Sequence, residues 1–319
     1  MNNHILLVGA GNLGSRHLQS LCSIETPLII DVVEPYENSR ELAKTRAKEI
    51  SGSNIHQLTF LVKIPQNNDY SLAIIATLAD VRSEILKEIF FQGNKLRHII
   101  LEKVLFQSTR QLIESEQLLQ INGVQSWVNY PRRMFDVYQN FSNNISDKKI
   151  KHFKTSGGAW GLACNSVHFL DLIEYLSHSK ITTVDMKNIA PKIHSSKRSG
   201  FYEFFGTFEG HLQNGSSYEI SCSEMDQELI IELEIENEAE KVVINESRQT
   251  LNYGEKTIPF SFPYQSSLTK IVWEDLNKHD YCQLTKLSET MGLNKIFLES
   301  FILFQNRISG NESEKLKIT

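Results

Sequence analysis

Cysteine is scarce in this chain. Four are present among 319 residues, and they are widely separated, at Cys22, Cys164, Cys222 and Cys282. No two of them have the short spacing of a metal site, so we expect no bound metal. Scattered single thiols are typical of proteins that stay reduced in the cytoplasm, which is where we expect this protein.

Long apolar runs are also missing. None approaches the roughly 18 residues that a bilayer span requires. The first apolar run leads directly into a glycine loop and lacks the charged region and small-residue cleavage site of a signal peptide. We therefore expect no membrane partner.

Nor is there a concentrated basic face. The net charge is −5, and charged residues make up 22% of the chain. Nucleic-acid binding requires Lys and Arg to gather on one face, so we expect no nucleic-acid partner. We interpret the short basic clusters at 148–151 and 197–198 as solvated edges.

What the chain does have is a glycine motif at its start. The apolar run 4–8 leads into Gly9-Ala10-Gly11-Asn12-Leu13-Gly14, and a helical pattern follows. In such a motif Gly9 permits the tight turn, Gly11 lets the backbone approach a pyrophosphate, and Gly14 allows close helix–strand packing. The helix start at Asn12 and Leu13 offers unpaired N–H groups to phosphates. The motif predicts a dinucleotide site, and a glycine-rich turn without a ligand is the alternative.

An acidic residue, Glu34, follows Gly14 by twenty positions, at the end of the next apolar run. A carboxylate there can accept both hydroxyls of an adenosine ribose, and it repels the extra phosphate of NADP. Asp31 lies too early in the strand for this role. We therefore expect NAD rather than NADP, although Arg40 could still reach a phosphate.

Residues 1–122 alternate apolar runs with helical patterns, which is typical of a parallel doubly wound sheet. The runs are nearly continuous, as expected for strands covered on both faces. Strands are expected at 4–8, 28–34, 71–77 and 98–103, with a less distinct one at 55–62. Helices are expected at 13–23, 38–50, 80–92 and 109–121. We predict an α/β fold in which residues 1–122 form an NAD-binding Rossmann domain.

Residues 123–319 are predicted to form a substrate-binding and oligomerisation domain of the α+β type, with an open, mainly antiparallel sheet. Apolar and polar residues alternate in segments near 201–208, 217–222, 229–235 and 241–244, with a turn signal at Asn214-Gly215. A strand at 124–130 runs into Pro131 and a helix. Further helices are expected at 165–177, 267–278 and 290–305, and the C-terminal ones can pack back on the first domain. The open sheet face is either a dimer surface or covered by a helix, and the polar tail 310–319 is expected to fray.

Ligands of a doubly wound sheet bind at the carboxyl ends of its strands. The glycine loop, Thr77 and Glu102-Lys103 all follow such strands, so we expect them to meet at one crevice. A lysine buried there can exchange a proton with a hydroxyl or carbonyl, since burial lowers its pKa. A charged pair at a strand end with no catalytic role is the alternative.

The second region has its own candidates. Arg132 and Arg133 follow a strand and could hold a carboxylate or phosphate in a two-pronged contact. Adjacent helix positions point about 100° apart, so at least one of them should face solvent. Trp160 could stack on a sugar ring or belong to the core. His168 follows the glycine-rich run that starts at Gly157, and by itself it would more often be structural.

Taken together, these motifs resemble those of the Gfo/Idh/MocA family, the glucose–fructose oxidoreductase and inositol dehydrogenase group. The resemblance covers nearly the whole chain and rests on the order of five motifs: Gly9–Gly14 continuing into His17, Ala76-Thr77, Glu102-Lys103, Val128–Arg133 and His168–Asp171. It implies a Rossmann domain followed by an α/β domain with an open antiparallel sheet, assembled as a homodimer or homotetramer. It also implies that Lys103 is the catalytic lysine and that His168 acts with it on a sugar or sugar derivative.

We accordingly assign two groups of contact residues. The cofactor contacts are Gly9, Gly11, Asn12, Leu13, Gly14, Glu34, Thr77, Glu102 and Lys103. The substrate contacts are Asn129, Arg132, Arg133, Trp160, Cys164, Asn165 and His168.

The chain departs from the family pattern at three places. Val104 replaces the proline that usually follows the lysine, so the turn that aims the lysine either differs or needs another support. Leu78 and Arg82 stand where the family often has proline and histidine. Cys164 replaces an aspartate four residues before His168, and a neutral thiol cannot accept a proton as a carboxylate does.

The leading hypothesis is an NAD(P)-dependent dehydrogenase or reductase in which a hydride passes between the nicotinamide and a hydroxyl or keto group. An NAD-using glycosidase is one alternative. A non-catalytic NAD-binding sensor or partner-binding protein is another, suggested by the loss of the acid at Cys164.

Overall fold

The computed structural model describes residues 3–319, which form two compact units. The first consists of the chain up to Phe106, Arg110–Asn129 and Pro263–Glu289. The second consists of Gln107–Thr109, Tyr130–Phe262 and Thr290–Thr319. Each unit has its own sheet, and each is described by itself.

The first unit is built on a seven-stranded sheet in which six strands are parallel. The strands are β1 (His4–Val8), β2 (Ile29–Val33), β3 (Gln57–Leu61), β4 (Asp69–Ile75), β5 (Lys95–Leu101), β6 (Gln125–Val128) and the antiparallel edge strand β17 (Thr285–Lys286). Their order is β17-β6-β5-β4-β1-β2-β3. The chain reverses direction across the sheet between β1 and β4, which is where doubly wound sheets bind ligands.

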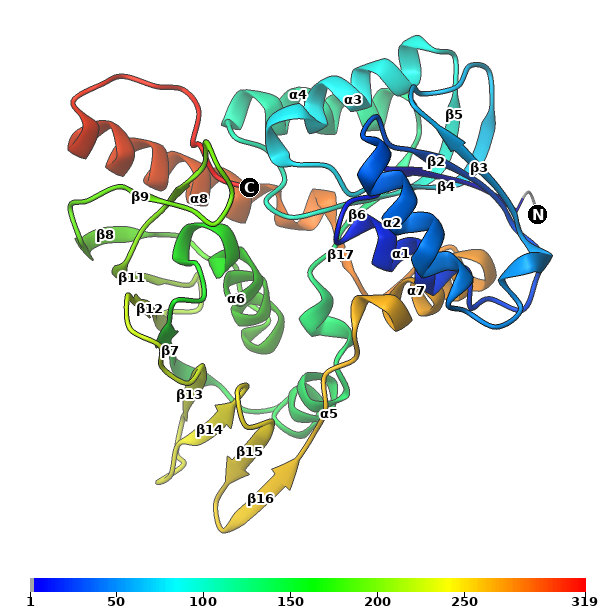
Figure 1. Cartoon of the computed structure of the whole chain (residues 1–319). Helices are drawn as coiled ribbons and strands as arrows, with labels where there is room; N and C mark the ends of the chain where they lie inside the picture. The colour runs from blue at the N-terminus through cyan, green and yellow to red at the C-terminus, as the bar shows by residue number, and fades with distance from the viewer. Residues whose placement is uncertain (1–2) are drawn as a thin grey trace. The chain divides into compact units, whose positions relative to one another are not determined.

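Helices cover both faces of this sheet (Figure 1). On one face lie α1 (Gly14–Leu21), α2 (Glu37–Lys48) and α7 (Gln265–His279), and on the other lie α3 (Ala79–Phe91) and α4 (Thr109–Ile121). A short 3₁₀ turn, Ser53–Ile55, precedes β3. Because both faces are covered, the central strands are buried along almost their whole length, as the continuous aliphatic runs predicted.

The second unit contains an eight-stranded, mainly antiparallel sheet ordered β16-β15-β14-β13-β7-β12-β11-β8. The strands are β7 (Ile150–Gly158), β8 (Asp185–Ile189), β11 (Gly206–His211), β12 (Ser217–Ser223), β13 (Ile230–Ile235), β14 (Val242–Asn245), β15 (Thr250–Tyr253) and β16 (Lys256–Pro259). Only β7 and β12 pair in parallel among these described strands. Two short strands, β9 (His194–Ser195) and β10 (Tyr202–Glu203), pair with each other.

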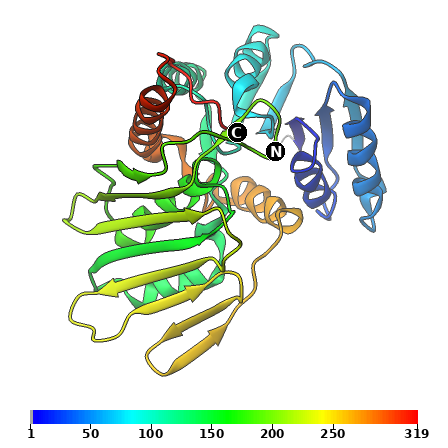
Figure 2. The same ribbon diagram turned by 60° about the vertical axis from the view of Figure 1, so that its left-hand side comes forward.

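Helices pack on one broad face of this sheet, and the other face is seen uncovered by helices of the described chain (Figure 2). The unit's helices are α5 (Asp136–Asn144), α6 (Leu162–Ser177) and α8 (Leu287–Ser309), with a 3₁₀ turn, η2, at Pro131–Met134. Buried aromatics such as Phe208 and Tyr218 form the covered face, and Phe208 packs against Phe301 of α8. Paired charges such as Lys154 and Glu219 occupy the other face. No helix of the described chain covers the open face, and the expectation that this face is a dimer surface stays a prediction.

The predicted fold class, an α/β parallel sheet followed by an open antiparallel one, is confirmed, and two local expectations are wrong. The helix expected after Pro131 is interrupted at Phe135, whose backbone is extended (φ −83°, ψ 126°) while its ring packs on Phe262. The tail does not fray, because Leu316 and Ile318 are fully buried. Leu316 N–H donates to the carbonyl of Gln107 at 2.8 Å.

Among the described residues, no helix is both long and apolar enough to cross a membrane. The same part of the chain holds no cluster of three or more His, Cys, Asp or Glu side chains suited to a metal ion.

Candidate functional site

The glycine loop lies between β1 and α1, at the switch point of the first sheet. Gly9 has a left-handed φ of +86°, and its N–H donates to the carbonyl of Val33 at 2.9 Å. A Cβ on Gly14 would lie 1.9 Å from the backbone oxygen of Gly9, so no other residue fits there. A Cβ on Gly11, by contrast, would have nothing within 4 Å. The fold itself therefore requires Gly9 and Gly14, whereas Gly11 leaves open space over the loop.

Glu34 directs its carboxylate at this loop. One oxygen accepts the N–H of Ala10 at 2.8 Å and the other accepts the N–H of Tyr36 at 3.0 Å. The side chain is buried, so the carboxylate is fixed beside the loop and retains acceptor capacity for hydroxyl groups. Asp31 is engaged elsewhere, by the Tyr70 hydroxyl at 2.8 Å and by His4 at 2.9 Å.

Two arginines lie close to the same corner. Arg40 donates to the backbone carbonyls of Glu34 and Pro35, each at 2.8 Å. Arg46, on α2, donates to the carbonyl of Asn12 at 2.7 Å and to the Ser15 hydroxyl at 2.6 Å. Positive charge therefore lies beside the N-terminal end of α1, and Arg46 ties α2 to the loop.

Glu102, at the end of β5, is the centre of a buried polar network. Its Oε1 is hydrogen-bonded to His17 Nε2 at 2.9 Å and accepts from Asn129 Nδ2 at 2.5 Å. The other ring nitrogen of His17 is hydrogen-bonded to Thr269 Oγ1 at 2.8 Å, and Asn129 also donates to Gln265. Helix α7 is thus joined to α1 and to the ends of β5 and β6.

Burial alone would raise the pKa of Glu102, but the hydrogen bonds from His17 and Asn129 and the nearby charge of Arg82 hold that pKa below its ordinary value. The residue is therefore an ionised anchor inside the unit. Lys103 follows it directly, half-buried, and the Lys103–Val104 peptide bond is cis.

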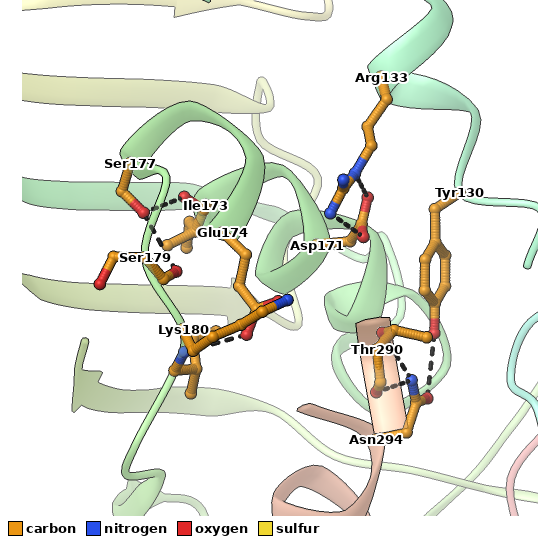
Figure 3. Close-up of polar contacts among 11 residues, drawn as sticks. Tyr130, Arg133, Asp171, Ile173, Glu174, Ser177, Ser179, Lys180, Thr290 and Asn294 are labelled. Atoms are coloured by element: carbon orange, nitrogen blue, oxygen red, sulfur yellow. Dashed lines mark hydrogen bonds and ion pairs between the residues drawn. The ribbon is translucent and has the colours of Figure 1, made fainter. Parts of the chain in front are cut away.

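In the second unit, the adjacent arginines of η2 both form two-pronged contacts with protein carboxylates. Arg133 binds Asp171 through two bonds of 2.8 Å (Figure 3), and Arg132 binds Glu246 through bonds of 2.8 and 2.7 Å. The expectation that one of them faces solvent is wrong, because their side chains are only 15% and 14% exposed. The physical reason is that each guanidinium is desolvated together with a matching carboxylate from elsewhere in the chain, Glu246 or Asp171.

The remaining second-unit candidates cluster at the start of α6. Asn165 donates to the carbonyl of Trp160 at 2.6 Å, and Trp160 donates to the carbonyl of Ser221 at 3.1 Å. Cys164 and His168 are both half-buried and lie one turn apart on the same side of the helix. The ring of His168 meets that of Tyr130 edge to face, with centroids 5.8 Å apart.

Tyr130 belongs to the same buried group. Burial and the charge of Asp171 raise its pKa well above the ordinary value, so its hydroxyl is neutral and donates to Asn294 at 3.0 Å (Figure 3).

Sequence reasoning missed an acid near this helix start. The carboxylate of Glu203, on β10, accepts the N–H of Ala163 at 2.6 Å and the N–H of Phe204, the next residue after Glu203, at 3.0 Å. A carboxylate in this place satisfies a backbone donor of the first helical turn and complements the helix dipole. No local signal announces it, because Glu203 lies forty residues from its partner.

The structure thus groups the glycine loop, Glu34, Thr77, Glu102, Lys103 and Asn129 in the first unit. Arg132, Arg133, Trp160, Cys164, Asn165 and His168 belong to the second.

No family model and no curated protein matches the sequence. Solved structures do match. UDP-N-acetylglucosamine 3-dehydrogenase of Acidithiobacillus ferrooxidans aligns over 94% of this chain and 97% of its own, with a TM-score of 0.70 and 12% identity. Biliverdin reductase of Synechocystis, solved with biliverdin and NADP⁺, aligns over 93% and 98%, with a TM-score of 0.71 and 14% identity. Scyllo-inositol dehydrogenase of Lactobacillus casei aligns over 94% and 97%, with a TM-score of 0.66 and 14% identity. The chain therefore has the two-unit fold of these oxidoreductases along nearly its whole length.

Proposed function

We propose that this protein is an NAD(P)-dependent oxidoreductase that transfers a hydride between the nicotinamide and a hydroxyl or keto group of a sugar or sugar derivative. The observation that carries the proposal is the glycine loop at the β1/β4 switch point. At this loop the fold places nothing within 4 Å of where a Cβ on Gly11 would lie, so that space is open. The Glu34 carboxylate is fixed beside the loop by the N–H of Ala10. Two of the matching structures are dehydrogenases of a sugar nucleotide and of a cyclitol, which supports the substrate class.

The residues of the loop fit a dinucleotide. A pyrophosphate over Gly11 would meet the N–H groups at the start of α1, and ribose hydroxyls would donate to Glu34. Because Glu34 would face the 2′ position, NAD is the preferred cofactor. When bound, the nicotinamide supplies the hydride donor or acceptor.

The proton would be handled by the chain's own side chains. Lys103 exchanges a proton with the substrate oxygen and, as a cation, stabilises negative charge on that oxygen. His168 acts with it on the same substrate. The other substrate contacts proposed are Asn129, Trp160, Cys164 and Asn165. Arg132 and Arg133 support the site through their carboxylate partners, because their two-pronged contacts are already made within the protein.

Cofactor binding is tested by titrating the protein into NADH and following nicotinamide fluorescence. Gly11→Ala adds a methyl group where the fold has room, so the protein should fold while NADH affinity falls by about tenfold or more, at least 1.4 kcal/mol. Gly292→Ala is the matched control, because a Cβ there also meets nothing within 4 Å. Equal NADH affinity in both variants would contradict the proposal.

Catalysis is tested by nicotinamide absorbance with a panel of sugars, sugar acids and nucleotide sugars. Lys103→Met should abolish turnover while NADH binding remains. The thiol of Cys164, in place of an acid, favours one other function, an NAD-binding sensor. That function predicts NADH binding without turnover on any member of the panel. Loss of a leaving group without net NADH would instead indicate the glycosidase.

We further propose that the protein acts in the cytoplasm as a homodimer or homotetramer, with the uncovered face of the eight-stranded sheet as the contact surface. Light scattering of the purified protein measures the assembly. A monomer at micromolar concentration would contradict this part of the proposal.

A further inference from the structure

We infer that Arg82 is the positioning residue for Lys103. This inference rests on the proposed function, because it gives Arg82 a role in placing the lysine that handles the proton. Arg82 lies in the first turns of α3, and its side chain is among the largest fully buried ones in the chain, with 1% exposure. A buried guanidinium needs several acceptors, and its partners show what it does.

The partners are backbone carbonyls from two loops at the ligand-binding end of the sheet. Arg82 Nη1 donates to the carbonyl of Val104 at 2.5 Å and to that of Leu105 at 2.6 Å. Its Nη2 donates to the carbonyl of Thr77. One side chain therefore joins the segment after β4 to the segment after β5.

Lys103 lies between two fixed points as a result. Before it, Glu102 is held by His17 and Asn129. After it, the carbonyls of the next two residues are held by Arg82. The side chain of Lys103 is half-buried, whereas its neighbours on both sides are buried, so the backbone position decides where the amine points.

The chemistry of the donor explains why an arginine is used. Val104 does not restrain the chain as a proline ring would, since only proline locks φ through its ring. Instead, the hydrogen bonds from Arg82 to the carbonyls of Val104 and Leu105 restrain the backbone just after Lys103. A histidine at position 82 has two ring nitrogens and could not reach three carbonyls at once, whereas a guanidinium has five donors in a rigid plane.

The test uses Arg82→Met, which keeps the length and removes every donor, and Arg82→Lys, which keeps the charge and fewer donors. Asn94→Ala is the matched control. Asn94 is also buried and donates to two carbonyls, of Pro65 at 2.8 Å and Ile89 at 3.0 Å, at the opposite end of α3 and β5. Both substitutions remove buried hydrogen bonds, but only one of them frees the Lys103 segment.

The readout is the rate at which trinitrobenzenesulfonate labels Lys103 in the folded full-length protein, measured by mass spectrometry, together with amide hydrogen exchange of residues 102–106. Arg82→Met should raise both rates by about tenfold, because buried carbonyls left without donors must move toward water. Arg82→Lys should reverse part of the increase, and Asn94→Ala should leave Lys103 labelling unchanged. Equal effects of Arg82→Met and Asn94→Ala would overturn the inference, and so would no effect of Arg82→Met.

Labelling requires no turnover, so this experiment is independent of the sugar panel. If Lys103→Met retained full turnover while Arg82→Met accelerated labelling, the proposed catalytic role of Lys103 would fail but the positioning by Arg82 would stand. If Lys103→Met abolished turnover and Arg82→Met changed neither the labelling rate nor the hydrogen-exchange rate, the catalytic role of Lys103 would stand but the positioning by Arg82 would fail.

Discussion

The ion pair between Arg133 and Asp171 offers the sharpest test of how the second unit is built. Asp171 is completely buried on α6, and Arg133 reaches it from η2 with both prongs of its guanidinium. Replacing Arg133 with Met removes these donors and leaves a buried carboxylate behind. Breaking a buried pair in this way costs about 3–5 kcal/mol, because the remaining charge has lost its main compensation.

The double variant Arg133→Met/Asp171→Leu should recover most of that loss. It replaces two desolvated charges with two apolar side chains of similar size, and such exchanges are often neutral or stabilising. The two substitutions are therefore strongly non-additive, and the interaction energy is the quantity to measure.

Hydrogen exchange of the α6 backbone measures the effect within the second unit alone. A loss of about 3 kcal/mol corresponds to at least a hundredfold faster exchange of its slowest amides, since each 1.4 kcal/mol is about tenfold. Peptides from β1 and β4, in the first unit, serve as the internal control and should be unchanged.

Two results would refute this reasoning. One is exchange that accelerates less than tenfold in Arg133→Met. The other is a double variant no more stable than the single one. If Arg133→Met instead left exchange unchanged and abolished turnover, Arg133 would be a substrate contact rather than a support for α6.

Three further predictions follow from other contacts. The pKa of Glu102 is lowered in the folded protein, so the ionised carboxylate stabilises the fold above the ordinary glutamate pKa of 4.5, and this stabilisation is lost as the pH falls through the lower pKa of the folded state. Acid unfolding followed by circular dichroism should therefore show that Glu102→Gln loses less stability below pH 4.5 than the wild type does. Glu34→Ala should weaken NADH binding by about tenfold and reduce the preference for NADH over NADPH, both measured by fluorescence titration. An unchanged preference for NADH would exclude Glu34 from ribose recognition. Leu316→Ala should cost about 2–5 kcal/mol in urea unfolding because the side chain is fully buried, and a neutral result would mean that the tail does not pack in solution.

The first sheet could be predicted from the sequence because its signals are local. Continuous aliphatic runs and the glycine motif give the parallel strands, and the predicted strand at 28–34 differs from β2 by one residue at each end. The ends of the strands also indicated Thr77 and Lys103 as candidates, since in a doubly wound sheet the ligand end is set by topology.

The polar partners could not be predicted, because they join residues that are far apart in the chain. His17 meets Thr269 across 252 positions, and Arg132 meets Glu246 across 114. No periodicity encodes such pairs. Residue type alone therefore made Arg132 and Arg133 resemble ligand contacts, whereas their geometry shows carboxylate partners within the protein.

The glycine motif shows what structure adds even where sequence succeeds. Its three glycines are equivalent in the pattern, but only Gly9 and Gly14 are demanded by backbone geometry and by contacts with the chain. Gly11 has an ordinary φ and open space where a Cβ would lie, so neither strain nor packing accounts for it. A glycine that the fold does not need, beside a fixed carboxylate and at the start of a helix, supports the proposal that a ligand approaches the backbone there. Substitution of Gly11 therefore tests the ligand with little disturbance of the fold, whereas substitution of Gly14 would test only the fold.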